Sequence, residues 1–471
     1  MATVRPFQGI LYDPHRVDVS RVVAPPYDVI TARDQQRYYR QDPHNVVRLI
    51  AGEVRPSDTP DDNKYTRAAG FFNEWLRQGI LRRETAPCLY VYRHEFLDPI
   101  TRVSRTRLGV LGVVELEPFG RGVLPHERTH ARAKADRLSL TRAVEANLSP
   151  VFALYEDPRD AIRPILDASM ADEPRLSITG EDGDQHSVWS MCGDHRFQEL
   201  AGVISASRLY VADGHHRYET ALNFRNKQRL EHPDAPADAA FNYVLMLLVD
   251  VRDPGLTILP THRLLHDLED FDAAALLGRL SDRHRVVPRA DRSALLAAMQ
   301  EPTPSHRIGI ALAADSPSPA CGGGQGGGLT TPSPLWGGSG RGYHGATPSP
   351  LWGGSGRGYY TIDIEQTLAT DPVSELDVSI LHREILQREL GLEEAAFEQE
   401  RYISYSRDIQ AVLDQVDAGA AQVGFLLRPP AVADVVAVAN AGQVMPQKST
   451  YFYPKPASGI VFNPLGADIR I

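Results

Sequence analysis

Hydrophobic residues in the middle of the chain follow two different periods in turn. The segments 208–212 (RLYVA) and 240–251 (AFNYVLMLLVDV) are short apolar runs of the kind that form strands. The second run is continuous enough for a strand that is covered on both faces. Between them, residues 217–228 have helical spacing. The pattern predicts a strand, a helix and a buried strand in succession.

The first third of the chain shows the same mixture. Residues 62–81 have the spacing of an amphipathic helix, and so do residues 135–146. The segments 87–96, 106–117 and 151–156 are rich in β-branched and aromatic residues, which favour strands. Helices and strands are therefore expected to alternate from the N-terminal region into the centre.

A low-complexity insert interrupts the last third. Residues 306–315 and 358–364 have the pattern of two hairpin arms, and the insert 315–358 lies between them. Its unit TPSPLWGGSGRGY occurs at 331–343 and again at 347–359, which is too short for a solenoid repeat. We interpret it as a disordered insertion at a hairpin tip, because long surface loops cost little. A ligand loop for a partner protein is the alternative.

These elements predict a mixed α/β protein of the α+β class. Its 471 residues exceed the usual size of one hydrophobic core, so several domains are expected. The expected division is an N-terminal α/β part over 1–120, a central part over 121–270, and a C-terminal α/β part over 271–471 that carries the insert.

Charge and composition limit the kinds of partner and compartment that are expected for this protein. The formal net charge of −10 argues against a nucleic-acid or anionic-membrane binder, and no run reaches the roughly 18 apolar residues of a membrane span. The three cysteines are far apart and form no CxxC, so neither a disulfide framework nor a cysteine zinc site is expected. With no signal-peptide pattern at the start, a cytoplasmic protein is predicted.

The stretch ADGHHRYETAL carries the clearest candidate chemistry. A strand ends at Asp213, which is a good helix N-cap, and Gly214 lets the backbone approach a ligand. His215, His216 and Arg217 then add donors and positive charge at the start of a helix, where backbone N–H groups are unpaired. Such a corner suits a phosphate, and a histidine there can also transfer a proton. Alternatively, Asp213 only caps the helix and the histidines bond neighbouring carbonyls.

The stretch HERTH, residues 126–130, literally matches the HExxH pattern of zinc peptidases. Pro125 directly precedes it and no third ligand follows at a familiar spacing, so zinc is not the favoured cofactor. The alternative is that His126 and Glu127 face the phosphate pocket, where Glu127 accepts a proton or holds Mg²⁺.

Further polar residues follow in two other segments. Lys134 and Arg137 lie just downstream of HERTH and can serve a phosphate, or they are simply the solvated start of a helix. Lys448 stands beside two hydroxyl residues in MPQKSTYF and is a candidate phosphate contact, although the glycine-rich cradle of a P-loop is missing.

The ordered segments APPYDVI, PHERT, KADRLSL, EANLSPVFALY, ADGHHRYETAL, LPTHR and MPQKSTYFYPK resemble domain-of-unknown-function family 1015 of bacteria and archaea. The resemblance extends from about Pro25 to Lys455, apart from the insert. The DGHHR segment also resembles the phosphate-binding corner of the ParB and sulfiredoxin-like fold. That group includes free-serine kinases, so the central part is expected to have this fold.

The resemblance implies phosphotransfer between a nucleotide, ADP or ATP with Mg²⁺, and serine or phosphoserine, including the direction that produces serine. In this hypothesis Gly214, His215, His216 and Arg217 bind phosphate, with His126, Lys134, Arg137 and Lys448 as further contacts. Glu127 or Asp213 is the base or the Mg²⁺ ligand, and His216 is a second catalytic candidate. The alternatives are a nucleotide-binding regulatory protein and a zinc hydrolase that uses HERTH.

Overall fold

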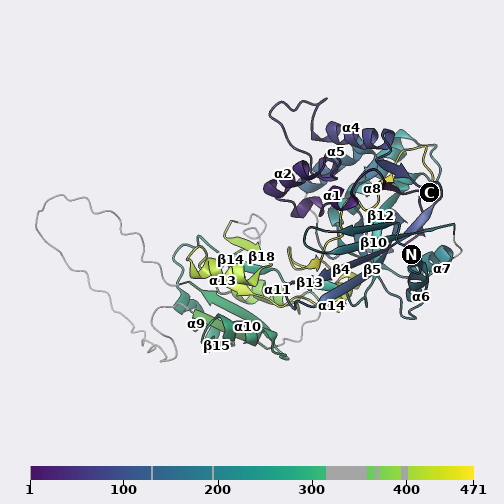
Figure 1. The fold of residues 1–471 in the computed structure, drawn as a ribbon. Coiled ribbons are helices and arrows are strands. Elements are labelled where there is room, and N and C mark those ends of the chain that lie inside the picture. The colour runs from purple at the N-terminus through teal and green to yellow at the C-terminus, as the bar shows by residue number, and fades with distance from the viewer. Residues whose placement is uncertain (1, 129–130, 194–195, 314–357, 366–370, 394–400) are drawn as a thin grey trace, which may run out of the picture. The chain divides into compact units, whose positions relative to one another are not determined.

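The protein consists of two compact units, seen here in a computed structural model. Unit 1 comprises Met1–Leu259 and Pro430–Ile471, and unit 2 comprises Pro260–Pro429. The boundaries therefore differ from the three parts expected from sequence, because the C-terminal segment joins the N-terminal and central regions. The structure describes residues 2–128, 131–193, 196–313, 358–365, 371–393 and 401–471 (Figure 1).

The core of unit 1 is a nine-stranded sheet of mixed direction. Its strand order is β6-β11-β8-β12-β5-β4-β10-β9, with β1 paired to β5. The main strands are β4 (Cys88–Leu97), β5 (Ser104–Glu115), β6 (Val123–Leu124), β8 (Val151–Tyr155), β9 (Leu176–Thr179), β10 (Gln185–Cys192), β11 (Leu209–Asp213) and β12 (Tyr243–Asp250). Strand β12 pairs parallel with β8 and antiparallel with β5. Its central position explains its continuous apolar sequence and confirms the predicted buried strand.

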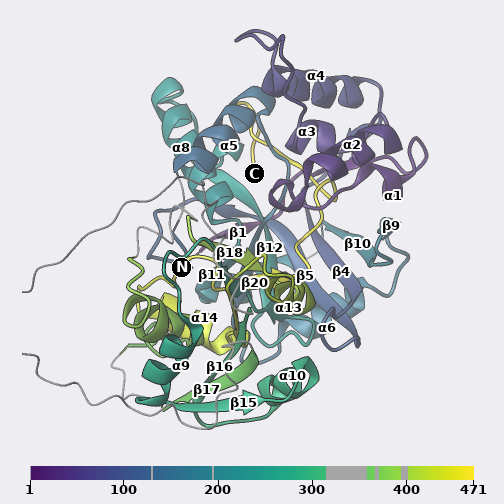
Figure 2. The same ribbon diagram turned by 90° about the vertical axis from the view of Figure 1, so that its left-hand side faces the viewer.

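Three helices of unit 1 pack in a row. Helix α5 (Ala131–Val144) contacts both α4 (Lys64–Arg77) and α8 (His215–Glu231), and Figures 1 and 2 show the three together. Tyr218 and Ala221 of α8 join the core that lines the sheet. The strand β11, the helix α8 and the strand β12 thus confirm the predicted succession.

The other elements of unit 1 are short. They are β1 (Val4–Arg5), β2 (Ile10–Tyr12), α1 (Val19–Val22), η1 (Tyr27–Val29), α2 (Ala32–Gln41), α3 (Val47–Ile50), β3 (Leu81–Arg83), β7 (Ala146–Asn147), α6 (Ile162–Ser169), α7 (Arg196–Ala206), η2 (Ala240–Asn242), β13 (Thr257–Leu259), α14 (Val432–Asn440), β20 (Tyr451–Tyr453) and β21 (Asn463–Pro464). Strand β20 pairs with β13, and this pairing holds the C-terminal segment against the rest of the unit.

Unit 2 is built on a six-stranded sheet of order β15-β17-β16-β19-β14-β18. Its elements are β14 (His262–Leu265), α9 (Ala273–Ser281), β15 (Arg285–Arg289), α10 (Arg292–Gln300), β16 (His306–Leu312), β17 (Gly358–Ile364), α11 (Asp377–Ile380), η3 (Leu381–Gln387), β18 (Ile403–Ser406), α13 (Ile409–Asp417) and β19 (Val423–Leu426). Strands β16 and β17 pair antiparallel, which confirms the predicted hairpin. Apart from Gly358, which begins β17, the insert lies outside the described residues, and so does the disorder predicted for it.

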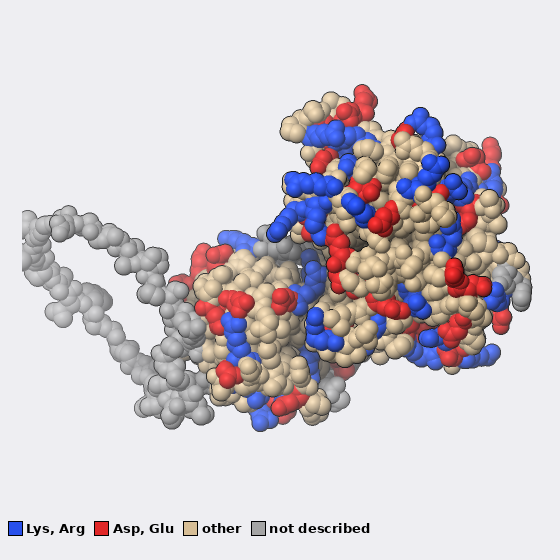
Figure 3. Space-filling view, in the orientation of Figure 1, with Lys and Arg blue, Asp and Glu red and all other residues tan. Residues whose placement is uncertain are grey.

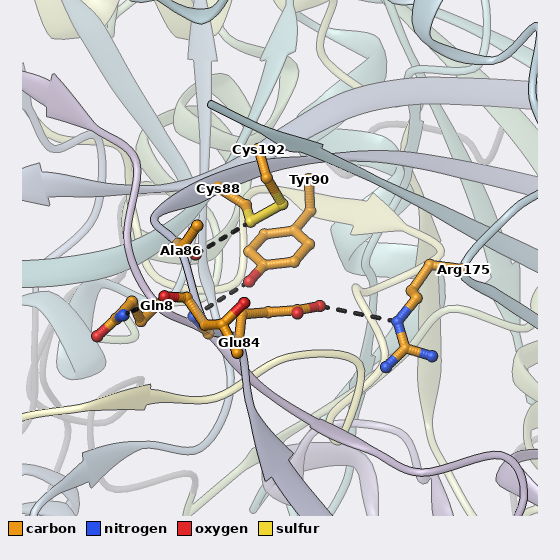
Figure 4. Close-up of a disulfide and its surroundings, with 9 residues drawn as sticks. Gln8, Glu84, Ala86, Cys88, Tyr90, Arg175 and Cys192 are labelled. Carbon is orange, nitrogen blue, oxygen red and sulfur yellow. Dashed lines mark hydrogen bonds and ion pairs between the residues drawn. A yellow bond between two sulfur atoms is a disulfide. The ribbon is translucent and has the colours of Figure 1, made fainter. Parts of the chain in front are cut away.

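A disulfide joins Cys88 and Cys192, so the expectation that the cysteines do not pair is wrong. The two residues are directly opposite each other on the antiparallel strands β4 and β10 (Figure 4). A sequence separation of 104 residues concealed this proximity, because only the strand register brings the two sulfur atoms together.

Basic and acidic side chains are interspersed on the face of the molecule shown in Figure 3. Among the described residues, no helix combines the length and the apolar character that a membrane crossing needs.

Candidate functional site

The DGHHR corner lies where β11 passes into α8. Gly214 has a left-handed φ of 92° and is the N-cap of α8, without a side-chain cap bond. The expectation that Asp213 caps the helix is therefore wrong. A Cβ on residue 214 would come within 2.9 Å of Nε of Arg217, so glycine leaves room for that guanidinium.

The first backbone hydrogen bond of α8 runs from the Tyr218 N–H to the Gly214 carbonyl, at 3.0 Å. The N–H groups of His215, His216 and Arg217 precede it, as at every helix start. Together with the positive end of the helix dipole, these donors favour an anion.

The carboxylate of Asp213 is neutralised by two cations instead of capping the helix. Its Oδ1 is 2.8 Å from Nζ of Lys455, and its Oδ2 pairs with Arg217. Lys455 also pairs with Asp28, and Arg217 donates a second hydrogen bond to the Pro150 carbonyl. Burial opposes the charge on Asp213, but Lys455 and Arg217 outweigh it and hold the pKa of Asp213 at about 2.

This network distinguishes the two candidate bases. A carboxylate with a pKa near 2 and both oxygens paired is a poor proton acceptor at neutral pH. The Asp28 and Asp213 charges in turn raise the pKa of Lys455, although its burial acts in the opposite direction. Lys455 is therefore a permanent cation, and its side chain is only 10% exposed.

Glu127 has the opposite character. Burial, reinforced by the charge of Asp213, raises the pKa of Glu127 to about 7, although Lys455 and Lys448 act to lower it. Its side chain keeps 38% exposure, so a substrate can reach the carboxylate. A pKa near the operating pH is the property that general acid–base catalysis requires.

His215 connects Glu127 to the helix start. Its Nε2 accepts a hydrogen bond from the His126 N–H at 3.3 Å, so the proton of the neutral ring is on Nδ1. That Nδ1 is 3.9 Å from Oε2 of Glu127. Burial lowers the pKa of His215 well below its usual value, and the ring is neutral.

His126 lies beside His215, with ring centroids 4.7 Å apart. Its Nδ1 donates to the Val211 carbonyl at 2.7 Å, and its Nε2 accepts from the Thr450 hydroxyl at 2.8 Å. Burial lowers the pKa of His126 to about 4. Both ring nitrogens of His126 are therefore engaged within the protein, and its backbone N–H bonds to His215.

The same bonds bear on the HERTH interpretation. Residues 126–128 precede α5 and are not helical, so they lack the helix on which HExxH zinc ligands share one face. His130 lies outside the described residues. A zinc ion could take His126 as a ligand only by displacing Val211 or Thr450 from its ring.

The other predicted residues lie around the corner with partners of their own. Lys134 pairs with Glu219 at 3.1 Å. Arg137 pairs with Asp136 and stacks on the Tyr27 ring, 3.9 Å from its centroid. These contacts join α5 to α8 and to the loop that carries Asp28.

Two predicted residues sit closer to solvent. Lys448 is exposed, has a left-handed φ of 56°, and is near enough for its charge to lower the pKa of Glu127. His216 is half-buried on the first turn of α8.

Sequence reasoning missed Lys455 and the bond from Thr450. Both belong to the C-terminal segment 445–457, which returns to the corner through the Met445 N–H bond to the His126 carbonyl. The signal was the polar cluster around Lys448, which identified the segment but not the lysine that pairs with Asp213.

Mg²⁺ fits only part of this site. Both oxygens of Asp213 are paired, so Asp213 would have to give up a cation before it bound the metal. Glu127 is exposed enough to be a ligand, and Mg²⁺ commonly uses one or two carboxylates with phosphate oxygens and water.

The chain belongs to the DUF1015 family of proteins of unknown function, whose model matches residues 4–318. No curated protein matches the sequence significantly.

Solved structures are similar at low scores. A conserved hypothetical protein from Pyrococcus furiosus has a TM-score of 0.30 and 12% identity, covering 71% of this chain and 89% of that one. A free serine kinase in complex with AMP has a TM-score of 0.31 and 11% identity, covering 70% and 83%. C-terminally truncated SbnI from Staphylococcus aureus has a TM-score of 0.30 and 10% identity, covering 76% of this chain and 85% of that one. Likenesses this weak say nothing about the chemistry of this chain.

Proposed function

We propose that the chain transfers a phosphoryl group between a nucleotide and serine or phosphoserine. The observation that carries the proposal is the position of Glu127, a carboxylate with a pKa near 7, beside the phosphate-suited start of α8. Phosphoryl transfer needs charge neutralisation, positioning and one proton acceptor, and this corner offers all three.

In this proposal the transferred phosphate lies against the backbone N–H groups of His215 and His216, and the imidazole of His216 donates a further hydrogen bond to it. Lys448 approaches it from the solvent side, and Lys455 and Arg217 supply fixed positive charge behind it. Glu127 takes the proton of the serine hydroxyl as the oxygen attacks phosphorus. In the reverse direction the protonated Glu127 returns that proton to the leaving serine oxygen.

The supporting residues have different tasks. His126 and His215 are neutral, and they orient Glu127 and the helix start. Lys134 and Arg137 act from α5, where Arg137 holds the loop of Tyr27. Mg²⁺ carried by the nucleotide would neutralise phosphate charge and leave Glu127 to act as the base.

The choice of serine or phosphoserine as substrate follows from the sequence resemblance of DGHHR to free-serine kinases. The ADP or ATP requirement and the cytoplasmic location are parts of the same proposal.

A nucleotide-binding regulatory protein is the second candidate. One observation favours it: Lys455 and Arg217 are already paired with Asp213, so an incoming phosphate must compete with a carboxylate of the protein. Competition of this kind can turn nucleotide binding into a conformational signal without turnover.

The test is an assay of the purified chain with Mg²⁺, offering ADP plus phosphoserine and, separately, ATP plus serine. We expect product in at least one direction, and its loss in His216→Ala, with the exposed His232→Ala as the matched control. Nucleotide binding without turnover would favour the regulatory protein. Turnover that persists unchanged in His216→Ala would move the site away from this corner.

A further inference from the structure

A second polar cluster in unit 1 borders a cavity of about 480 Å³. The walls come from loop 23–29, helix α2, the turn 180–184 before β10, and segment 451–457. The volume lies in the range of about 300–1,000 Å³ that is usual for small-molecule sites, and it is much larger than serine needs. Lys455, which pairs with Asp213 at the DGHHR corner, also lines this cavity.

His94 and Asp184 form the first half of the cluster. Nη2 of the buried Arg107 donates to Nδ1 of His94 at 3.2 Å, so the neutral ring carries its proton on Nε2. That Nε2 donates to Oδ2 of Asp184 at 2.9 Å. The side chains of His94 and Asp184 are only 2% and 9% exposed. One carboxylate oxygen of Asp184 is therefore held firmly by the protein.

His186 is oriented in the same way. The Tyr92 hydroxyl lies 2.7 Å from Nδ1 of His186, the acceptor that the described residues offer its proton, so the hydroxyl donates to Nδ1. The neutral ring of His186 must then carry its proton on Nε2. Its ring lies 4.1 Å from that of His94, centroid to centroid. His186 thus presents a fixed N–H donor.

The cluster offers a donor next to an acceptor. In the described part of the chain, His94 and Tyr92 account for the bonds of Asp184 Oδ2 and His186 Nδ1, which leaves Oδ1 and Nε2 for a ligand. Both residues line the cavity, together with Tyr451 and Tyr453. Tyrosine rings are stacking surfaces for nucleobases.

We propose that this cavity binds the adenine base of a nucleotide. Oδ1 of Asp184 accepts a hydrogen bond from the exocyclic amino group, and Nε2 of His186 donates one to the adjacent ring nitrogen. The proposal rests on the nucleotide-dependent function above, and it places the base on one side of Lys455 and the phosphates on the other. Inosine has a carbonyl and an N–H at these two positions, so it meets an acceptor with an acceptor and a donor with a donor.

The test is calorimetric titration of the full chain with adenosine and with inosine. We expect adenosine to bind at least about tenfold more tightly, because mismatched buried polar groups remain unpaired. Asp184→Asn is expected to lower this preference several-fold, because an amide can present an N–H to the inosine carbonyl. The control is Asp167→Asn, which changes an exposed carboxylate on α6. If Asp184→Asn does not fold, His186→Phe serves instead. It removes the N–H donor and should weaken adenosine binding several-fold.

Equal affinity for the two nucleosides, or no saturable adenosine binding at millimolar concentration, overturns this inference. So does a preference that Asp184→Asn or His186→Phe leaves unchanged. Adenosine has no phosphate, so the outcome is separate from that of the phosphotransfer assay. Selective adenosine binding without turnover contradicts only the proposed function, and turnover without adenosine selectivity contradicts only the adenine site.

Discussion

Two polar clusters in unit 1 use the same kinds of side chain in opposite ways. At the start of α8, Asp213 is ionised and held between Lys455 and Arg217. Around β4 and β10, His94 and His186 are neutral, and each has one tautomer set by a neighbour. The first cluster concentrates charge, whereas the second arranges neutral donors and one acceptor.

The difference shows what burial does where nearby charges outweigh it and where they do not. Lys455 and Arg217 outweigh the cost of burying Asp213, so its carboxylate stays charged with a pKa of about 2. Burial and the neighbouring His94 leave the pKa of His186 at about 3, so the ring stays neutral. Glu127 stands between these extremes, because its burial is only partly compensated. Fixed positive charge favours binding of a phosphate, whereas neutral donors and acceptors of fixed direction favour hydrogen bonds to a nucleobase.

The largest expected effect is on turnover in Glu127→Gln. Loss of a general base costs about 10²–10⁴-fold in rate, and glutamine has the same shape without the proton-accepting oxygen. The two directions should show opposite pH profiles. With ATP and serine, the rate should rise as pH increases through about 7, where Glu127 ionises. With ADP and phosphoserine, it should fall through the same range, because the protonated form is needed.

The matched control for Glu127→Gln is Glu231→Gln, which removes an exposed carboxylate at the end of α8. Identical pH profiles in both directions would contradict a proton-transferring role for Glu127, even if the variant were inactive.

The next effect is on stability, in Lys455→Met. Removing one member of a buried ion pair leaves the partner charge uncompensated, and such losses cost about 3 kcal/mol or more. Arg217 still pairs with Asp213, so we expect a loss of unfolding free energy close to about 3 kcal/mol. Urea denaturation measures it, with Lys227→Met as control, because the exposed Lys227–Glu231 pair contributes about 1 kcal/mol at most. A further Asp213→Asn substitution should recover part of the loss; no recovery would mean that packing of the lysine stem, rather than charge, is responsible.

Local sequence predicts much of the fold and the first of the two clusters, the one at the start of α8. The buried run at β12, the hairpin β16–β17 and the helix after DGHHR all follow from periodicity and are confirmed. The mixed α/β class follows from the same patterns. Asp213 and His215 could be identified because the turn and the cationic residues are contiguous in the chain.

The rest depends on strand register and on long-range return of the chain. Asp184 and His94 meet because β10 pairs with β4, and the same pairing joins Cys88 to Cys192. No local pattern encodes that register. Lys455 reaches Asp213 only because the C-terminal segment comes back to unit 1. The tautomers of His94 and His186 follow from their hydrogen-bond partners, which the sequence does not reveal.

A smaller effect is expected in Tyr92→Phe. The change leaves Nδ1 of the buried His186 without the hydroxyl, and an unsatisfied buried group of this kind costs about 1–3 kcal/mol. The sharper readout is ¹⁵N NMR of the histidine rings. Wild-type His186 should carry its proton on Nε2, and the variant should shift the population towards Nδ1. Tyr90→Phe, on the same strand, removes a hydroxyl that accepts from the Gly9 N–H and should leave His186 unchanged. A wild-type ring already protonated on Nδ1 would contradict the orientation described for this cluster.

The smallest effect concerns the stability of Glu127→Gln. The folded-state pKa of Glu127 is raised to about 7, above its value in the unfolded chain, because burial disfavours the charged carboxylate. Glu127 therefore opposes folding as pH rises from the unfolded pKa through about 7, and it is neutral with respect to folding at acid pH. Since 38% of the side chain is exposed, solvent screens the effect to about 1 kcal/mol or less. Thermal denaturation should show Glu127→Gln slightly more stable than wild type at pH 8 and equal to it at pH 4. A variant less stable at pH 8 would mean that the ionised carboxylate is stabilised by Lys455 and Lys448 more than burial destabilises it, and Glu127 would then resemble Asp213.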